Sequence, residues 1–420
     1  MTERIKSLVK HPLVSGSSVV FLGSFGANFI NYLFNLSMGR LLTISDYGLL
    51  TSLNSLFILV GIFSISFNNV MAKFSAKYFS LKDEQSTAVL INYAGKFILV
   101  FSGIIFVCLF LLVPQIGNFL HISNHFFIEL ILIALFFALV LSVASGFIQG
   151  RLQFVFLSFV TIIQPVIKIF IGVGLVLVGF SVFGSLVGIA LSTALPAIAL
   201  YGYLMRKFGF RSSQKTDTAF KKEFIHYIYT YFLSGVGISL LSNTDIILVR
   251  HFFEAQTSGQ YAALSLMGKA ILYFTAPITT VFFPIIAYKK ERKERLFEVV
   301  LLACGIVVGV SVILSVIYFA FPYLVLRVFF PKPGYRILAH YLGYYSLYIL
   351  VFSFASILNS YFLSIGRTKV YIITLVGAAI QIGSIILFHS SLYAIIAGLF
   401  TASLVMLLLF LIYYYIHGEH

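Results

Sequence analysis

The stretch FIELILIALFFALVLSVASGFIQ, residues 127–149, is long enough to cross a bilayer and contains one charged residue, Glu129. Backbone in lipid must satisfy its own hydrogen bonds, so this stretch is predicted to be a helix. The sequence therefore predicts an all-α polytopic membrane protein with about 12 transmembrane helices, because eleven more stretches of this kind occur: 15–38, 47–71, 90–113, 155–178, 182–205, 227–249, 260–286, 297–320, 338–363, 368–388 and 392–416.

The composition of the whole chain agrees with lipid as its main solvent. Hydrophobic residues make up 60% and charged residues 10%, whereas about a quarter of a soluble domain is charged. The formal net charge of +15 could indicate nucleic-acid binding, but the basic residues are scattered through loops. Topology and contact with anionic lipid explain them, so no nucleic-acid partner is expected. Cys108 and Cys304 both lie in predicted spans and show no pattern of a disulfide or metal site.

The Lys and Arg residues between the spans predict the orientation, because cytoplasmic loops carry an excess of them. With a cytoplasmic N-terminus, 20 of the 28 basic residues fall in inside segments and five in outside segments. The remaining three, Lys96, Lys168 and Lys269, fall within spans. Both termini are therefore predicted to be cytoplasmic.

Two sequence landmarks recur in the second half of the chain. Tyr47 in DYGLL and Tyr261 in GQYAA are 214 residues apart, and the dipeptide Gly-Arg occurs at 150–151 and again 216 residues later at 366–367. A duplication of six spans explains both offsets. Six spans return the chain to its starting side of the membrane, so the two halves are predicted to be parallel repeats.

The duplication predicts two six-helix lobes around a central cavity. The N-terminal lobe is residues 1–205 and the C-terminal lobe is residues 227–420. The basic stretch 206–226 is predicted to be a cytoplasmic linker between them.

Polar residues form stripes on four of the predicted spans, since helical residues three or four apart share a face. One interpretation is that these side chains hydrogen-bond neighbouring helices together. Their repetition on several spans favours the other, a water-filled cavity in which Asn31, Asn35 and Gln164 are candidate substrate-binding residues. The stripes are Ser24, Asn28, Asn31 and Asn35; Ser158, Thr161, Gln164 and Lys168; Ser239, Ser242 and Asp245; and Tyr261, Ser265, Lys269 and Tyr273.

The charged residues of the spans are the strongest candidates for function, because a charge in the membrane usually faces a cavity or a partner. Lys168 and Lys269, in opposite halves, predict a cationic site for a phosphate or carboxylate; the alternatives are a buried pair with a carboxylate such as Asp245, or snorkelling. Asp245 is either the coupling residue for H⁺ or Na⁺ or a structural hydrogen-bonding group. Arg40 and Arg250, at the outer ends of their spans, either anchor at headgroups or meet an anionic substrate.

Several motifs resemble those of the polysaccharide transporters, and together they cover both halves of the chain. They are GRLL at 39–42 followed by DYG at 46–48, GFIQG at 146–150 leading to Phe154, NTDIILVRHF at 243–252 followed by GQYAA at 259–263, and Phe283-Pro284. On these motifs the chain is similar to the oligosaccharide flippases, which belong to the superfamily that includes the multidrug and toxin extrusion (MATE) transporters.

The resemblance implies alternating access by two lobes. The implied substrate is an isoprenoid-pyrophosphate-linked oligosaccharide, moved from the cytoplasmic to the outer leaflet of a bacterial or archaeal cytoplasmic membrane for cell-surface polysaccharide biosynthesis. It implies no catalytic residue, metal or cofactor, and its further partners would be other polysaccharide-assembly membrane proteins. The expected functional unit is a monomer. The lipid II branch often has two further spans, which this chain lacks, so that substrate is not expected.

Two other functions are open to the same sequence. A MATE-like cation-coupled drug antiporter would use an acidic or aromatic cavity, to which the tyrosines of span 338–363 could contribute. A membrane polysaccharide polymerase usually needs paired carboxylates or a large outer loop. The predicted outer loops 114–126 and 321–337 contain no acid, so an enzyme is not expected.

Overall fold

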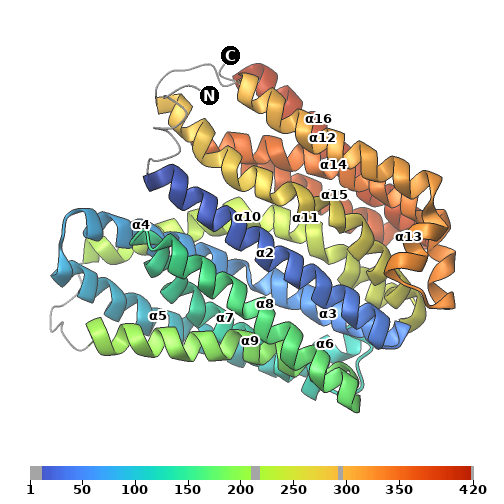
Figure 1. Cartoon of the computed structure of the whole chain (residues 1–420), viewed down its shortest axis with the longest axis horizontal. Helices are drawn as coiled ribbons and strands as arrows, with labels where there is room; N and C mark the ends of the chain where they lie inside the picture. Colours follow the sequence, from blue (N-terminus) through green and yellow to red (C-terminus); the bar gives the residue numbers. More distant parts are fainter. Residues whose placement is uncertain (1–11, 210–217, 292–296, 418–420) are drawn as a thin grey trace. The chain divides into compact units, whose positions relative to one another are not determined.

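The computed structural model describes residues 12–209, 218–291 and 297–417, and this part of the chain is helical with no strand (Figure 1). It confirms the predicted all-α fold. Ten helical stretches of the described residues are long and apolar enough, by length and composition, to cross a membrane. One of them, Phe154–Lys207, contains two predicted spans, and the helix Ala255–Glu291 covers the predicted span 260–286. About 12 spans are therefore consistent with the structure.

Contacts within the chain define two compact units that are not continuous in sequence. Unit 1 comprises Met1–Phe34 and Val60–Leu233, and unit 2 comprises Asn35–Leu59 and Ser234–His420. Two helices, α2 (Pro12–Leu41) and α10 (Thr218–Phe252), therefore begin in unit 1 and end in unit 2. Residues 206–209 and 218–226 of the predicted linker are helical, and 210–217 lie outside the described residues, as do 1–11 and 418–420. The lobe boundaries inferred from the duplication stay a prediction.

In unit 1, α7 packs against α4, α5 and α9, and α8 packs against α9. The GFIQG motif explains the closest of these contacts, because a Cβ at Gly146 would lie 2.3 Å from the carbonyl oxygen of Asn68, and one at Gly150 2.4 Å from that of Ala72. The helices of this unit, besides the first part of α2 and α10, are α4 (Ile62–Ser80), α5 (Glu84–Leu111), α6 (Val113–Leu120), α7 (Phe126–Gly150), α8 (Phe154–Leu175), η1 (Val176–Phe180), α9 (Ser181–Leu204) and η2 (Met205–Gly209).

In unit 2, α14 lies at the centre and packs against α11, α12 and α16, while α15 packs against α16. The N-terminal segment of the chain contributes α3 (Ile44–Val60) to this unit. The other helices are α11 (Ala255–Glu291), α12 (Phe297–Ala320), α13 (Pro322–Phe329), η3 (Pro333–Leu338), α14 (Ala339–Ser364), η4 (Thr368–Val370), α15 (Tyr371–Leu387) and α16 (Leu392–His417).

Two departures from the predicted spans are visible. The predicted span 47–71 is interrupted at Gly61, where α3 ends and α4 begins, and α4 continues to Ser80. The second departure is in the predicted outer loops, which contain the eight-residue helices α6 and α13. Each of these short helices has a proline in its first turn, so proline's fixed backbone angle starts the helix where the long span ends.

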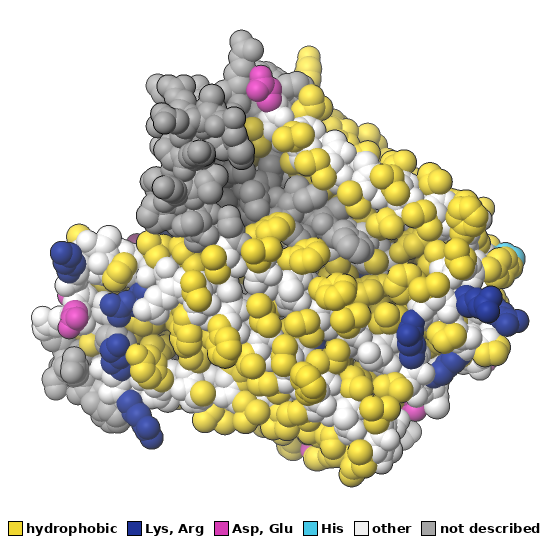
Figure 2. Space-filling view, viewed as in Figure 1, with side chains coloured by type: hydrophobic (Ala, Val, Ile, Leu, Met, Phe, Trp, Pro, Cys, Tyr) yellow, Lys and Arg dark blue, Asp and Glu magenta, His cyan; other side chains and the backbone are white. Residues whose placement is uncertain are grey.

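The surface of the described residues is that of a protein in lipid. Hydrophobic side chains are spread across the described part of the face shown in Figure 2, where charged side chains are few. Among the large exposed hydrophobic residues, Phe170 and Val178 of unit 1 are each 76% exposed and Leu302 of unit 2 is 65% exposed. Water would penalise such a surface, so the protein is a multi-pass membrane protein.

Candidate functional site

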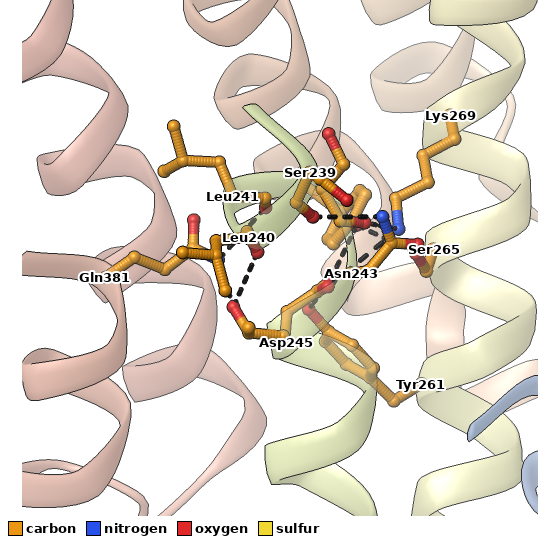
Figure 3. Close-up of polar contacts among 12 residues, drawn as sticks. Ser239, Leu240, Leu241, Asn243, Asp245, Tyr261, Ser265, Lys269 and Gln381 are labelled. Atoms are coloured by element: carbon orange, nitrogen blue, oxygen red, sulfur yellow. Dashed lines mark hydrogen bonds and ion pairs between the residues drawn. The ribbon is translucent and has the colours of Figure 1, made fainter. Parts of the chain in front are cut away.

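The polar centre of unit 2 is built around Asp245 on α10, whose side chain is fully buried (Figure 3). Its oxygen Oδ2 accepts a hydrogen bond of 2.8 Å from the hydroxyl of Tyr261 on α11. Its other oxygen, Oδ1, lies 3.9 Å from the ammonium nitrogen of Lys269, which is further along α11. Two predicted site residues are therefore brought together, Asp245 and Lys269, as an ion pair.

Lys269 is held in this position by the backbone of α10. Its Nζ donates a hydrogen bond of 2.6 Å to the carbonyl oxygen of Ser242, and 16% of its side chain is exposed. At 3.9 Å the contact with Asp245 is an ion pair without a direct hydrogen bond. The buried-pair alternative from the sequence is thus the arrangement in the structure, and it does not exclude a second, anionic partner at the exposed side of the ammonium group.

Tyrosines of α14 also lie beside the Asp245–Lys269 pair. The hydroxyl of Tyr345 lies 3.1 Å from Ser265 Oγ and 3.5 Å from Asp245 Oδ2, and its ring meets that of Tyr261 edge-on. Tyr348 packs edge-on against Tyr345, and both are buried. The tyrosine-rich span 338–363 is evident in the sequence, but its contact with Asp245 could not be predicted, because a uniformly apolar span does not show which helix it pairs with.

Gln381 on α15 is a further polar residue that the sequence analysis missed. Its side-chain nitrogen donates to the carbonyl oxygen of Leu241 at 3.0 Å and to Thr244 Oγ1 at 3.3 Å, which ties α15 to α10 beside Asp245. Its side-chain oxygen is buried without a hydrogen-bond partner among the described residues. The sequence did contain a signal for this contact, because an amide inside the predicted span 368–388 is expected to form a hydrogen bond with a neighbouring helix.

In unit 1, Lys168 lies on α8, half-buried, with its ammonium group 4.6 Å from the ring centre of Phe34 on α2. No described carboxylate of the same unit lies within ion-pair distance of it. A cation over an aromatic face gains about 2 kcal/mol when both are removed from water, and a charge inside the membrane costs about 3 kcal/mol or more, so the contact compensates only part of the cost. Lys168 therefore differs from Lys269, which has a carboxylate.

The amide side chains of the predicted stripes either form hydrogen bonds within their own helices or are partly buried. Asn31 donates to the carbonyl oxygen of Ala27 at 3.1 Å. Asn35 and Gln164 are half-buried. The stripe on α8 also joins helices, because Ser158 Oγ donates to the carbonyl oxygen of Val19 on α2 at 3.0 Å.

The two predicted outer arginines have different surroundings, both in unit 2. Arg40 is exposed, and its guanidinium donates to the carbonyl oxygens of Phe329, at 3.0 Å, and Val328. It thereby satisfies the last carbonyls of α13, as basic side chains do at helix C-termini. Arg250 is 4% exposed, so it lies inside the unit. Lys332 reaches the same region by donating to the carbonyl oxygen of Leu42, and burial lowers the pKa of its ammonium group.

Metal ligation finds no support in the described residues, where no three His, Cys, Asp or Glu side chains come close enough to share an ion. The polar groups described above are intramembrane cations, a carboxylate and tyrosine hydroxyls. Such groups can bind an anion, exchange a proton or hold a monovalent cation.

Solved structures of transporters share this fold. A multidrug resistance MATE family transporter of the MOP superfamily in an inward-facing conformation is 13% identical and superposes with a TM-score of 0.73 over 93% of this chain and 94% of its own. The MATE multidrug transporter DinF-BH is 16% identical, with a TM-score of 0.72 over 97% and 96%. A MOP superfamily transporter from Pyrococcus furiosus, reported to have a binding pocket of reverse polarity suggesting a different function, is 14% identical, with a TM-score of 0.68 over 100% and 98%.

These likenesses define the fold as that of the MATE-like transporters. The family follows from the sequence itself, because the model of the polysaccharide biosynthesis protein family matches residues 13–290. The chain belongs to this family, and the resemblance to polysaccharide transporters is confirmed. No curated protein gives a significant sequence match. Family and fold together describe a membrane transporter.

Proposed function

We propose that the protein moves an isoprenoid-pyrophosphate-linked oligosaccharide from the cytoplasmic to the outer leaflet of a bacterial or archaeal cytoplasmic membrane, with both termini cytoplasmic. The observation that carries the proposal is Lys168, an intramembrane cation with no described carboxylate partner in its unit. A pyrophosphate supplies the missing negative charge and accepts strong charge-assisted hydrogen bonds. The family's role in polysaccharide biosynthesis supports such a substrate.

The substrate would meet further groups on its path. Lys269 is the second proposed cation, with Asn31, Asn35 and Gln164 as hydrogen-bonding residues and Arg40 and Arg250 near the outer side. Asp245 is the proposed coupling residue for H⁺ or Na⁺. The reverse polarity reported for the Pyrococcus furiosus pocket supports the idea that a MATE-like fold can serve a substrate other than a drug.

Transport should be measured in proteoliposomes by the appearance of a fluorescent isoprenoid-pyrophosphate sugar in the outer leaflet. We expect Lys168→Ala to slow transport about tenfold or more while the protein still folds, because the substrate loses a charge-assisted contact in a low-dielectric region. Lys96→Ala is the matched control, since Lys96 is an exposed lysine near the inner end of another predicted span. Equal rates for Lys168→Ala and the wild type would remove Lys168 from the substrate path.

A drug antiporter is the second candidate, favoured by the buried tyrosines next to Asp245 and by the multidrug transporters of the same fold. The same proteoliposomes should then release a cationic dye against a cation gradient, with Asp245→Asn inactive. Dye release without movement of the lipid-linked sugar would favour this function. Hydrolysis or extension of the sugar by the purified protein would instead indicate a polymerase.

A further inference from the structure

Unit 1 has an open groove at one end of α8 and α9, and none of the residues proposed for transport lines it. Its volume is about 740 Å³. The lining is mainly aliphatic and aromatic, and four of its hydrophobic residues are more than half exposed: Val155 at 72%, Phe159 at 60%, Tyr203 at 53% and Leu152 at 52%. A groove of this kind on a membrane protein is a place for hydrocarbon, because lipid is the solvent around it.

A smaller hollow of about 30 Å³ adjoins the groove, and basic side chains line it. Gln153, Phe156, Leu200 and Tyr203 line both hollows, and the smaller one adds the basic side chains of Arg151 and Lys207. None of the described residues that line either hollow is acidic. The groove therefore has an apolar body and a cationic end.

The two basic residues are held at this end by aromatic neighbours. The guanidinium of Arg151, which follows the last residue of α7, lies 5.1 Å from the ring centre of Phe79 and 5.5 Å from that of Phe147. Lys207, in η2 at the end of α9, donates a hydrogen bond of 3.1 Å to the hydroxyl of Tyr203. Ordered cations lose less rotamer freedom on binding an anion than freely moving ones do.

We infer that this groove binds an acidic glycerophospholipid, with the phosphate of the headgroup at Arg151 and Lys207 and an acyl chain along Phe156, Phe159 and Leu200. Basic pockets between helices at the membrane surface are suited to such headgroups, and each basic residue strengthens the attraction about fivefold. In the proposed orientation the lipid comes from the cytoplasmic leaflet. The inference does not depend on which substrate the protein transports.

Lipid binding to the purified full-length protein should be followed by native mass spectrometry, with phosphatidylglycerol and phosphatidylcholine titrated separately. We expect one tightly held phosphatidylglycerol, and about a 25-fold loss of its affinity in the double variant Arg151→Gln/Lys207→Gln, about fivefold for each basic residue removed. Binding of phosphatidylcholine should change little. The variant Val155→Trp keeps both charges but places a bulky ring in the groove, and it should weaken the binding of both lipids.

The repeat provides a matched control. Arg367 lies three residues after the end of α14, in the second copy of the Gly-Arg dipeptide, and Lys369 is an exposed basic residue close to it. Arg367→Gln/Lys369→Gln removes the same charge from unit 2 and should leave the tight phosphatidylglycerol in place. Equal loss in both double variants, or no loss in either, would overturn the inference. So would binding of isoprenyl pyrophosphate but not of phosphatidylglycerol at Arg151 and Lys207, because the groove would then belong to the transported lipid.

Discussion

Lys269→Ala is expected to lower the stability of the protein by about 3 kcal/mol or more, because it leaves the carboxylate of Asp245 buried without its cation. Asp245 is fully buried, and its remaining described hydrogen bonds come from Tyr261 and Tyr345, at 2.8 and 3.5 Å. Neutral hydroxyls compensate a buried charge far less than an ammonium group does. The measurement is the midpoint of thermal unfolding in detergent.

A double-mutant cycle separates the loss of the pair from the loss of the lysine side chain. Asp245→Asn should destabilise the protein less than Lys269→Ala does. In the Asn variant the ammonium group of Lys269 still donates a hydrogen bond to the carbonyl oxygen of Ser242, and its side chain is still partly exposed. The double variant Asp245→Asn/Lys269→Ala should be more stable than Lys269→Ala alone, since no buried charge remains. Additive effects of the two single substitutions would show that the ion pair contributes nothing, contrary to this expectation.

The second large effect is expected at Gly259, where substitution by alanine should cost about 1–3 kcal/mol. A Cβ at this position would lie 1.8 Å from the carbonyl oxygen of Ile44, which is backbone and cannot turn aside. Gly48→Ala should act in the same direction, because its Cβ would lie 2.7 Å from the Gly259 nitrogen. The yield of monodisperse protein and its thermal midpoint measure both effects.

The sign of the effect distinguishes close packing from helix propensity. Alanine is the better helix former by about 1 kcal/mol. Replacing a glycine that has space around it by alanine should therefore leave the stability of the protein unchanged or raise it. Gly103 in α5 and Gly305 in α12 are such positions, since nothing described lies within 4 Å of a Cβ built there. Stability of Gly259→Ala equal to that of these two controls would contradict the packing seen between α3 and α11.

Much of the fold could be predicted because a spanning helix is defined by length and hydropathy, which are local properties. The predicted spans other than 47–71 coincide with helices. The break between the spans 155–178 and 182–205 occurs at Gly179, where φ is +104°, in the interval that the hydropathy pattern left between them. The helices α6 and α13 were missed because eight residues are too few for a span, and short apolar stretches between spans read as loops.

The site could be predicted only in part. Asp245, Lys269 and Tyr261 were recognised because polar residues are rare in these spans, and a pair between Asp245 and Lys269 was among the alternatives. Whether the two residues form a pair depends on how α10 and α11 are rotated about their axes. The sequence of a helix that is apolar on every side does not show which side faces its neighbour. The contact between Lys168 and Phe34 was not foreseen, because phenylalanine is too common here, at 46 residues, to single one out.

The exchange of segments between the two units has a consequence for synthesis of the protein. α3 leaves the ribosome early, but its partners in unit 2, which include Gly259, are made about 200 residues later, at a rate of about 5–20 residues per second. For roughly ten seconds or more Gly48 therefore lacks its neighbour Gly259. A fragment that ended at Leu233 would contain α3 without the rest of unit 2, so residues 1–233 and 234–420 are expected not to complete their packing when they are made as separate chains.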